Sequence, residues 1–187
     1  MKAVFLRSAL IGLSLSLAGC AAAPFGASSD GIDVARFHLN QPFARSQIAV
    51  DAADPADRNA PEFAFYRQAV EAQLRRLGWT IVPTTGQSEQ IALIDVEQGS
   101  RAALASRRTI GGGAPIGSGR GAADLVTTLL EVSIRRRSDA TVFWEGRADM
   151  EARAGSAAAS PGEAVPRLAA ALFQDFPGES GRTIRLR

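Results

Sequence analysis

The sequence predicts an α+β fold: a mainly antiparallel sheet of five to seven strands with two helices packed on one face. Apolar and polar residues alternate over 125–134 and again over 141–152, which predicts a long β-hairpin. Only two segments, near 61–77 and 163–176, place apolar residues three and four positions apart, as amphipathic helices do. Shorter β-rich runs make up much of the rest. Because hairpins outnumber helices, we expect both helices to cover the same face of one sheet.

Residues 1–19 are predicted to be the signal peptide of a lipoprotein. Lys2 and Arg7 precede an apolar run at 9–17, which is shorter than the roughly 20 residues of a transmembrane helix. The stretch Leu17-Ala18-Gly19-Cys20 then resembles the lipobox of bacterial lipoproteins. The resemblance implies cleavage just before Cys20 and acylation of this residue, the only cysteine of the chain. An ordinary signal peptide with an incidental cysteine is the alternative.

The charge that remains without the leader argues against a nucleic-acid partner. The whole chain has 21 basic and 19 acidic residues, and Lys2 and Arg7 leave with the leader, so 19 basic residues remain against 19 acidic ones. A neutral exported domain lacks the excess of basic residues that is typical of nucleic-acid binding. We expect a membrane partner instead, through the lipid at Cys20. Ala21 lacks the carboxylate that favours inner-membrane retention in enterobacteria, so by resemblance we expect an outer-membrane, periplasm-facing position.

Local patterns predict the elements before residue 80. Cys20 and the small, polar residues up to 31 predict a lipidated flexible tether, and 32–187 then forms one domain. Runs at 32–39 and 46–50 are β-rich, with the turn signal Asn40-Gln41-Pro42 between them. A helix is expected from Pro61, with Gly78 as its stop. Its apolar stripe comprises Phe63, Tyr66, Val70, Leu74 and Leu77.

The second half of the chain is expected to add most of the sheet. Strands are predicted at 79–83 and 91–96, before the long hairpin. Gly146 lies within that hairpin and indicates a bulge or a close backbone approach. A second helix is expected to start near Glu163, because Pro166 conflicts with an earlier start, and to end at Pro177-Gly178. Residues 183–186 predict a last edge strand.

Four features together resemble one family of bacterial lipoproteins. They are the lipobox, the first helix with its exit at Gly78-Trp79, the segment Trp144-Glu145-Gly146-Arg147-Ala148, and the terminal Phe176-Pro177. Over residues 32–178 the chain resembles the lipoproteins catalogued as domain of unknown function 4136. The resemblance implies a periplasm-facing lipoprotein domain and carries over no catalytic residues. A glycine-rich insertion departs from the family pattern.

That glycine-rich stretch, at about 105–122, is expected to be a loop and not a nucleotide site. It contains no lysine, so it cannot be the P-loop G-x-x-x-x-G-K-[ST], and a strand follows it where a phosphate site needs a helix. Arginines around this stretch and at the hairpin turn form a candidate surface for lipid phosphate or an acidic envelope protein. They are Arg101, Arg107, Arg108, Arg120, Arg135, Arg136 and Arg137. The alternative is that these arginines are simply solvated.

No catalytic or metal-binding set stands out, so we expect no enzymatic activity, no cofactor and no metal. His38 is the only histidine, and no G-x-S-x-G motif occurs. We interpret four carboxylates in the predicted strands as outward-facing positions. They are Asp95, Glu97, Glu131 and Glu145.

Three functional hypotheses follow. The first is a membrane-anchored envelope lipoprotein with a non-enzymatic binding or structural role. The second is an auxiliary lipoprotein of a lipid or ABC-type transport system, which would need an apolar groove rimmed by arginines. The third is an enzyme, a cell-wall or glycan hydrolase, which would need two close carboxylates in a cleft.

Overall fold

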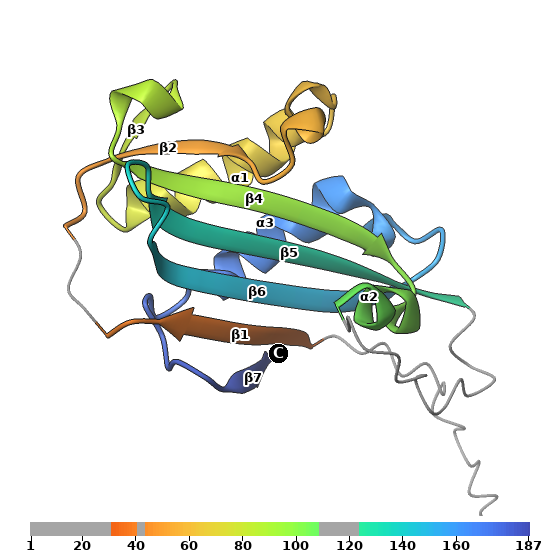
Figure 1. Ribbon diagram of the computed structural model, residues 1–187. Helices are drawn as coiled ribbons and strands as arrows, with labels where there is room; N and C mark the ends of the chain where they lie inside the picture. Colours follow the sequence, from red (N-terminus) through yellow and green to blue (C-terminus); the bar gives the residue numbers. More distant parts are fainter. Residues whose placement is uncertain (1–30, 41–43, 109–123) are drawn as a thin grey trace, which may run out of the picture.

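A computed structural model describes residues 31–40, 44–108 and 124–187. Its centre is a seven-stranded sheet in the order β3-β2-β4-β5-β6-β1-β7 (Figure 1). The strands are β1 (Ile32–His38), β2 (Gln47–Ala52), β3 (Thr80–Val82), β4 (Gln90–Gly99), β5 (Leu125–Arg136), β6 (Val142–Arg153) and β7 (Thr183–Leu186). The helices are α1 (Phe63–Arg76), α2 (Arg101–Arg108) and α3 (Pro161–Leu172). The predicted α+β class is confirmed.

The sheet is mixed, which corrects the prediction of a mainly antiparallel one. Strand β2 runs parallel to both β3 and β4, whereas the other neighbouring strands are antiparallel. The reason is that α1 connects β2 to β3 as a crossover, and a crossover helix returns the chain in the same direction. Strands β1 and β2 are not partners despite the turn signal between them, because β1 lies between β6 and β7.

The long hairpin of β5 and β6 is the centre of the sheet. Its register runs from Leu125 opposite Arg153 to Arg135 opposite Val142, with an irregularity after Ile134. Gly146 is therefore not the bulge. A close approach occurs there instead, because the Trp144 ring and the Leu172 side chain lie over the Gly146 backbone.

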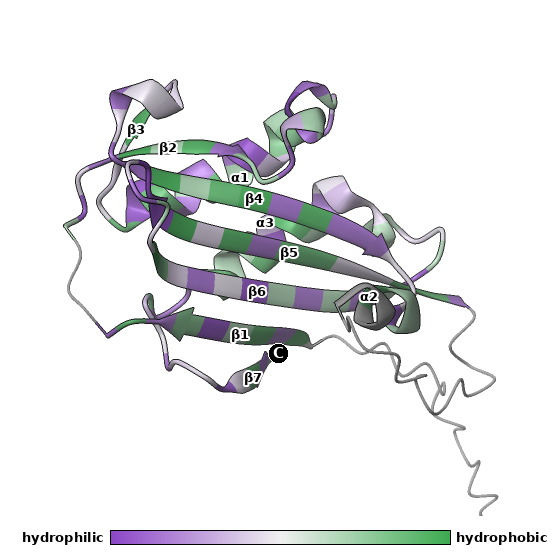
Figure 2. Cartoon of the chain, viewed as in Figure 1, coloured by the Kyte–Doolittle hydropathy of each residue, from purple (hydrophilic) through white to green (hydrophobic). Residues whose placement is uncertain are grey.

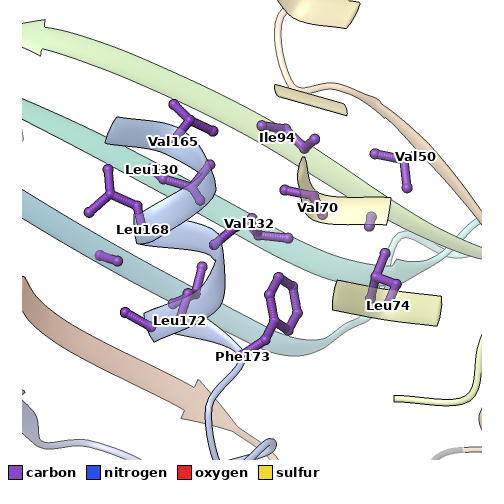
Figure 3. Packing of buried hydrophobic residues seen from close by; sticks show 14 of the residues in the cluster. Val50, Val70, Leu74, Ile94, Leu130, Val132, Val165, Leu168, Leu172 and Phe173 are labelled. Atoms are coloured by element: carbon purple, nitrogen blue, oxygen red, sulfur yellow. The ribbon is translucent and has the colours of Figure 1, made fainter. Parts of the chain in front are cut away.

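Helices α1 and α3 cover one face of the sheet and pack against each other, behind the strands in Figure 1. Their buried side chains meet those of β2, β4, β5 and β6 in one continuous core, part of which Figure 3 shows. The labelled residues are Val50, Val70, Leu74, Ile94, Leu130, Val132, Val165, Leu168, Leu172 and Phe173. The predicted stripe of α1 contributes Phe63, Val70 and Leu74 to the buried set. The intervals of three and four in the sequence thus mark its core side.

Helix α3 starts at Pro161, two residues before the predicted start near Glu163. Ser160 is its N-cap, and Pro161 occupies the first helical position, where its missing N–H costs nothing. Pro166 lies inside the helix and removes one backbone hydrogen bond. Burial of six residues of this short helix, Val165 and Leu168 among them, offsets that loss.

Helix α2 was not predicted, and it overlaps the start of the expected glycine-rich loop. It extends to Arg108, so 105–108 is helical, while 109–123 lies outside the described residues. Leu104 is buried and packs near Gly99, at the end of β4. Helix α2 therefore lies on the face opposite α1 and α3, in front of the sheet in Figure 1. Within the described ranges, no helix is long and apolar enough to cross a bilayer.

Candidate functional site

The sheet face opposite α1 and α3 carries a wide field of carboxylates. Along β4, β5 and β6, residues alternate between the core and this second face, and Figure 2 shows the resulting hydrophilic bands. The carboxylates are Asp33, Asp95, Glu97, Glu131, Glu145, Asp149 and Glu151. In the described part of the chain, no three His, Cys, Asp or Glu side chains gather closely enough to hold a metal ion.

Arg101 of α2 anchors the helix to this face. Its Nε donates to Glu151 Oε1 at 2.7 Å, and its Nη2 lies 3.1 Å from Asp149 Oδ2 and 3.7 Å from Asp33 Oδ2. The hydrogen bond to Glu151, aided by the charges of Asp149 and Asp33, raises the pKa of Arg101 although burial opposes it. The guanidinium thus links α2 to two strands, β1 and β6.

The candidate arginine surface is divided in the structure. Arg101 lies at the end of the sheet where β5 begins, and Arg135–Arg137 lie where β5 ends. Arg136 pairs with Asp139 at 2.6 Å and lies over the Phe143 ring, and Arg137 pairs with Glu89 at 3.1 Å. The side chains of Arg107 and Arg108, and both Arg120 and Cys20 entirely, lie outside the described residues.

His38 makes a local structural contact. Its Nε2 lies 3.0 Å from the carbonyl oxygen of Gly178, and its backbone N–H donates to the Ser180 hydroxyl. Both contacts hold the segment after α3 against the end of β1. This arrangement suits a histidine that fixes a loop.

The two motifs of the family resemblance meet in the core. Trp144 stacks on Phe173 with ring centroids 5.3 Å apart, and it also contacts Phe176. The Trp144 indole N–H donates to the Pro177 carbonyl at 3.0 Å. The segment from Trp144 to Ala148 and the terminal Phe176-Pro177 therefore hold β6 and the end of α3 together, which is a structural role.

Arg36 of β1 also contacts the end of α3, and the sequence analysis did not predict this contact. Arg36 is 3% exposed, and its guanidinium donates to the carbonyl oxygens of Leu172, Ala171 and Gln174. These carbonyls belong to the last turn of α3 and to the turn that follows it, where the helical hydrogen-bond pattern ends. The Ala171 carbonyl also accepts from the Gln174 N–H. Burial lowers the pKa of Arg36, and the Asp175 carboxylate opposes that shift. The only sequence feature that could have indicated this buried contact is the position of Arg36 within a β-rich run.

Two concave regions were also missed. A polar hollow of about 700 Å³ lies beside β4, just where β2 ends. Its walls are Ala53, Asp54, Pro55, Asp57, Asp95, Val96, Glu97 and Gln98. A smaller apolar groove of about 220 Å³ lies between α1 and α3, where Phe65 is 66% exposed. Tyr66 also lines this groove, and burial together with the Glu62 charge raises its pKa.

Comparisons with known proteins give distant similarities. No family model matches the chain. An uncharacterized protein of Zymomonas mobilis subsp. mobilis is 26% identical, and the match covers 83% of this chain and 80% of that protein.

Among solved structures, a PDZ domain protein from Parabacteroides distasonis aligns with a TM-score of 0.49 and 9% identity over 83% of this chain. This chain spans only 38% of that protein. A PelC dodecamer from Paraburkholderia phytofirmans aligns with a TM-score of 0.46 and 14% identity, over 74% of this chain and 93% of PelC.

Proposed function

We propose that this protein is a lipid-anchored, periplasm-facing lipoprotein of the outer membrane, similar to the family of domain of unknown function 4136, with a non-enzymatic binding role. The observation that carries the proposal is Leu17-Ala18-Gly19-Cys20 at the end of a short apolar leader. Buried acyl carbons contribute about 0.8 kcal/mol each, so two or three chains on Cys20 anchor the protein durably. The first strand, β1, begins at Ile32, so 21–31 can serve as the tether.

The chemistry of the second sheet face supports a binding role over catalysis. Asp33 and Asp149 lie opposite each other in register, but both contact Arg101. They therefore serve as counter-ions of one guanidinium, whereas a glycosidase needs one carboxylate as an acid and the other as a base or nucleophile. His38 is engaged with the Gly178 carbonyl, which suits a structural role.

A role in lipid or ABC-type transport is the second candidate. The apolar groove between α1 and α3 favours it, because a lipid tail needs such a lining. At about 220 Å³ the groove is smaller than the roughly 300–1,000 Å³ of typical ligand pockets. No arginine lines it, although the transport hypothesis expected an arginine rim. The groove therefore gives the transport role only partial support.

Acylation of Cys20 is the test of the proposal. Cells that express the chain are fed a fatty-acid analogue, and the protein is examined for label and for membrane fraction. We expect the wild-type chain to be labelled and Cys20→Ser to be unlabelled. Ser16→Ala, a change within the leader that spares the cysteine, is the control and retains the label. Label on the Cys20→Ser variant would refute the lipoprotein assignment.

A further inference from the structure

The outer edge of β4 is open over its last residues. Strand β2 ends at Ala52, which lies opposite Ile94, whereas β4 continues to Gly99. The Ala53 N–H donates to the Ile94 carbonyl at 2.8 Å, so the backbone groups of Ile94 face the β2 side. Every second residue of a strand faces the same side, and Val96 and Gln98 therefore direct their N–H and C=O groups away from β5. No described strand lies along that edge.

On the opposite side of the sheet, the part of β1 that extends beyond β7 is covered by a loop. Strand β7 pairs with β1 only from Ile32 to Ala35. Beyond that point the Gly181 N–H donates to the Arg36 carbonyl, and the Ser180 hydroxyl accepts from the His38 N–H. Natural sheets usually block exposed edges, as this loop does for β1. The open edge of β4 is thus a candidate template for an added strand.

The space beside this edge has the size and charge for such a strand. The hollow of about 700 Å³ follows β4 from Asp95 to Gln98. Two exposed carboxylates, Asp54 and Asp57, line it, and no arginine or lysine is among its lining residues. An acidic wall disfavours an acidic occupant, including the same edge of a second copy. It favours a segment that carries arginine or lysine.

We propose that the outer edge of β4 binds an extended, basic segment of a partner protein, which adds a strand beside Val96–Gly99. Backbone hydrogen bonds to Val96 and Gln98 supply affinity, and the carboxylates of the hollow select the charge. The Gln98 side chain is fixed by hydrogen bonds to Thr128 Oγ1 and the Ala159 carbonyl, so the edge is already ordered for pairing. This inference deepens the proposed binding role and rests on it.

A labelled peptide of alternating arginine and valine is the probe. It is titrated by fluorescence anisotropy against the full chain purified in detergent. The control peptide has the same sequence with N-methyl groups on four consecutive central residues, which block both of its edges. We expect the unmodified peptide to bind at least about tenfold more tightly, because strand addition depends on backbone hydrogen bonds. Equal affinity of the two peptides would overturn the proposal.

Charge reversal locates the site. Asp57 is exposed and lines the hollow, and Asp57→Arg is expected to weaken binding of the probe about tenfold. Glu145 is exposed on β6, away from the hollow, and Glu145→Arg is the matched control, with less than about a twofold change. Equal losses in both variants would indicate general electrostatic attraction and contradict the site.

Hydrogen exchange tests the geometry independently. Bound probe is expected to slow exchange of the Val96 and Gln98 amides and to leave the Leu129 amide unchanged, since Leu129 already lies within the β4–β5 pair. Unchanged exchange at Val96 and Gln98 contradicts strand addition. Self-association that blocks the probe would assign the edge to a second copy instead. Labelling of Cys20 is unaffected by any of these results, so failure here and failure of the lipoprotein assignment are distinguishable.

Discussion

The indole ring of Trp144 lies over the α-carbon of Gly146, two residues along the same strand. A Cβ at position 146 would overlap the Trp144 ring and would lie 2.8 Å from Leu172 Cδ1. Trp144 is fully buried, and its ring stacks on Phe173. The spacing Trp-x-Gly is therefore a steric requirement, because a side chain at position 146 would occupy the space of the buried Trp144 ring.

Gly146→Ala should accordingly destabilise the protein. The added methyl group forces the buried ring or Leu172 to move, and overpacking of this kind costs about 1–3 kcal/mol. Chemical denaturation followed by tryptophan fluorescence measures the free energy of unfolding. Gly86→Ala is the control, since a Cβ there meets nothing within 4 Å and should change stability by less than about 0.5 kcal/mol. Equal stability of Gly146→Ala and wild type would show that the ring is free to shift.

Replacing Arg36 tests the cap at the end of α3. Arg36→Met keeps much of the side-chain volume but removes the guanidinium that donates to the carbonyls of Leu172, Ala171 and Gln174. We expect a loss of about 3 kcal/mol in the free energy of unfolding, because buried polar groups without partners are costly. Arg36→Lys should recover part of the loss, since one ammonium reaches fewer carbonyls.

Arg76→Met is the matched control for this experiment. Arg76 is exposed on α1 and bonds only to Gln73 in the described contacts, so its loss should cost less than about 0.5 kcal/mol. Urea denaturation of the three variants against wild type measures the differences. A cost at Arg36 no larger than that at Arg76 would mean that water replaces the cap.

The sequence could predict what depends on local pattern. The stripe of α1, the β5–β6 hairpin and the constraint at Gly146 all follow from spacing along the chain. The parallel pairing of β2, the cap at Arg36 and the hollow beside β4 depend on contacts between distant segments. Arg36 and Leu172, for example, are 136 positions apart, and no local pattern marks their contact. Helix α2 was missed for a related reason, since the contacts of its Arg101 with β1 and β6 join segments that are distant in the sequence.

Arg101→Met should release α2 while leaving the rest of the fold intact. The Arg101 side chain is about half exposed, so its ion pairs contribute only about 1 kcal/mol or less to global stability. They nevertheless link α2 directly to β1 and β6. Amide exchange of Leu104, whose N–H donates to the Ser100 carbonyl, should therefore accelerate strongly while the denaturation midpoint barely moves.

Arg153→Met is the control for the release of α2. Arg153 is exposed at the end of β6 and makes no ion pair within the described residues. Its removal should leave exchange of the Leu104 amide unchanged. If Arg101→Met also leaves that amide protected, burial of the Leu104 side chain alone holds the helix.

Acid should weaken the turn between β5 and β6. A hydrogen bond from the Ser138 side chain, together with the Arg137 charge and the Ser138 N–H, lowers the pKa of Glu89. The Thr141 N–H, together with the Thr141 side chain and Arg136, lowers the pKa of Asp139. Depressed pKa values contribute stability above the unfolded-state pKa, near 4, and this contribution is lost as the pH falls through the folded-state values. Glu89→Gln combined with Asp139→Asn should therefore lower the urea midpoint at about pH 7. As the pH falls towards about 2 and the wild-type carboxylates take up protons, the variant and wild type should converge. A difference of equal size at both pH values would assign the stabilisation to contacts that do not depend on charge.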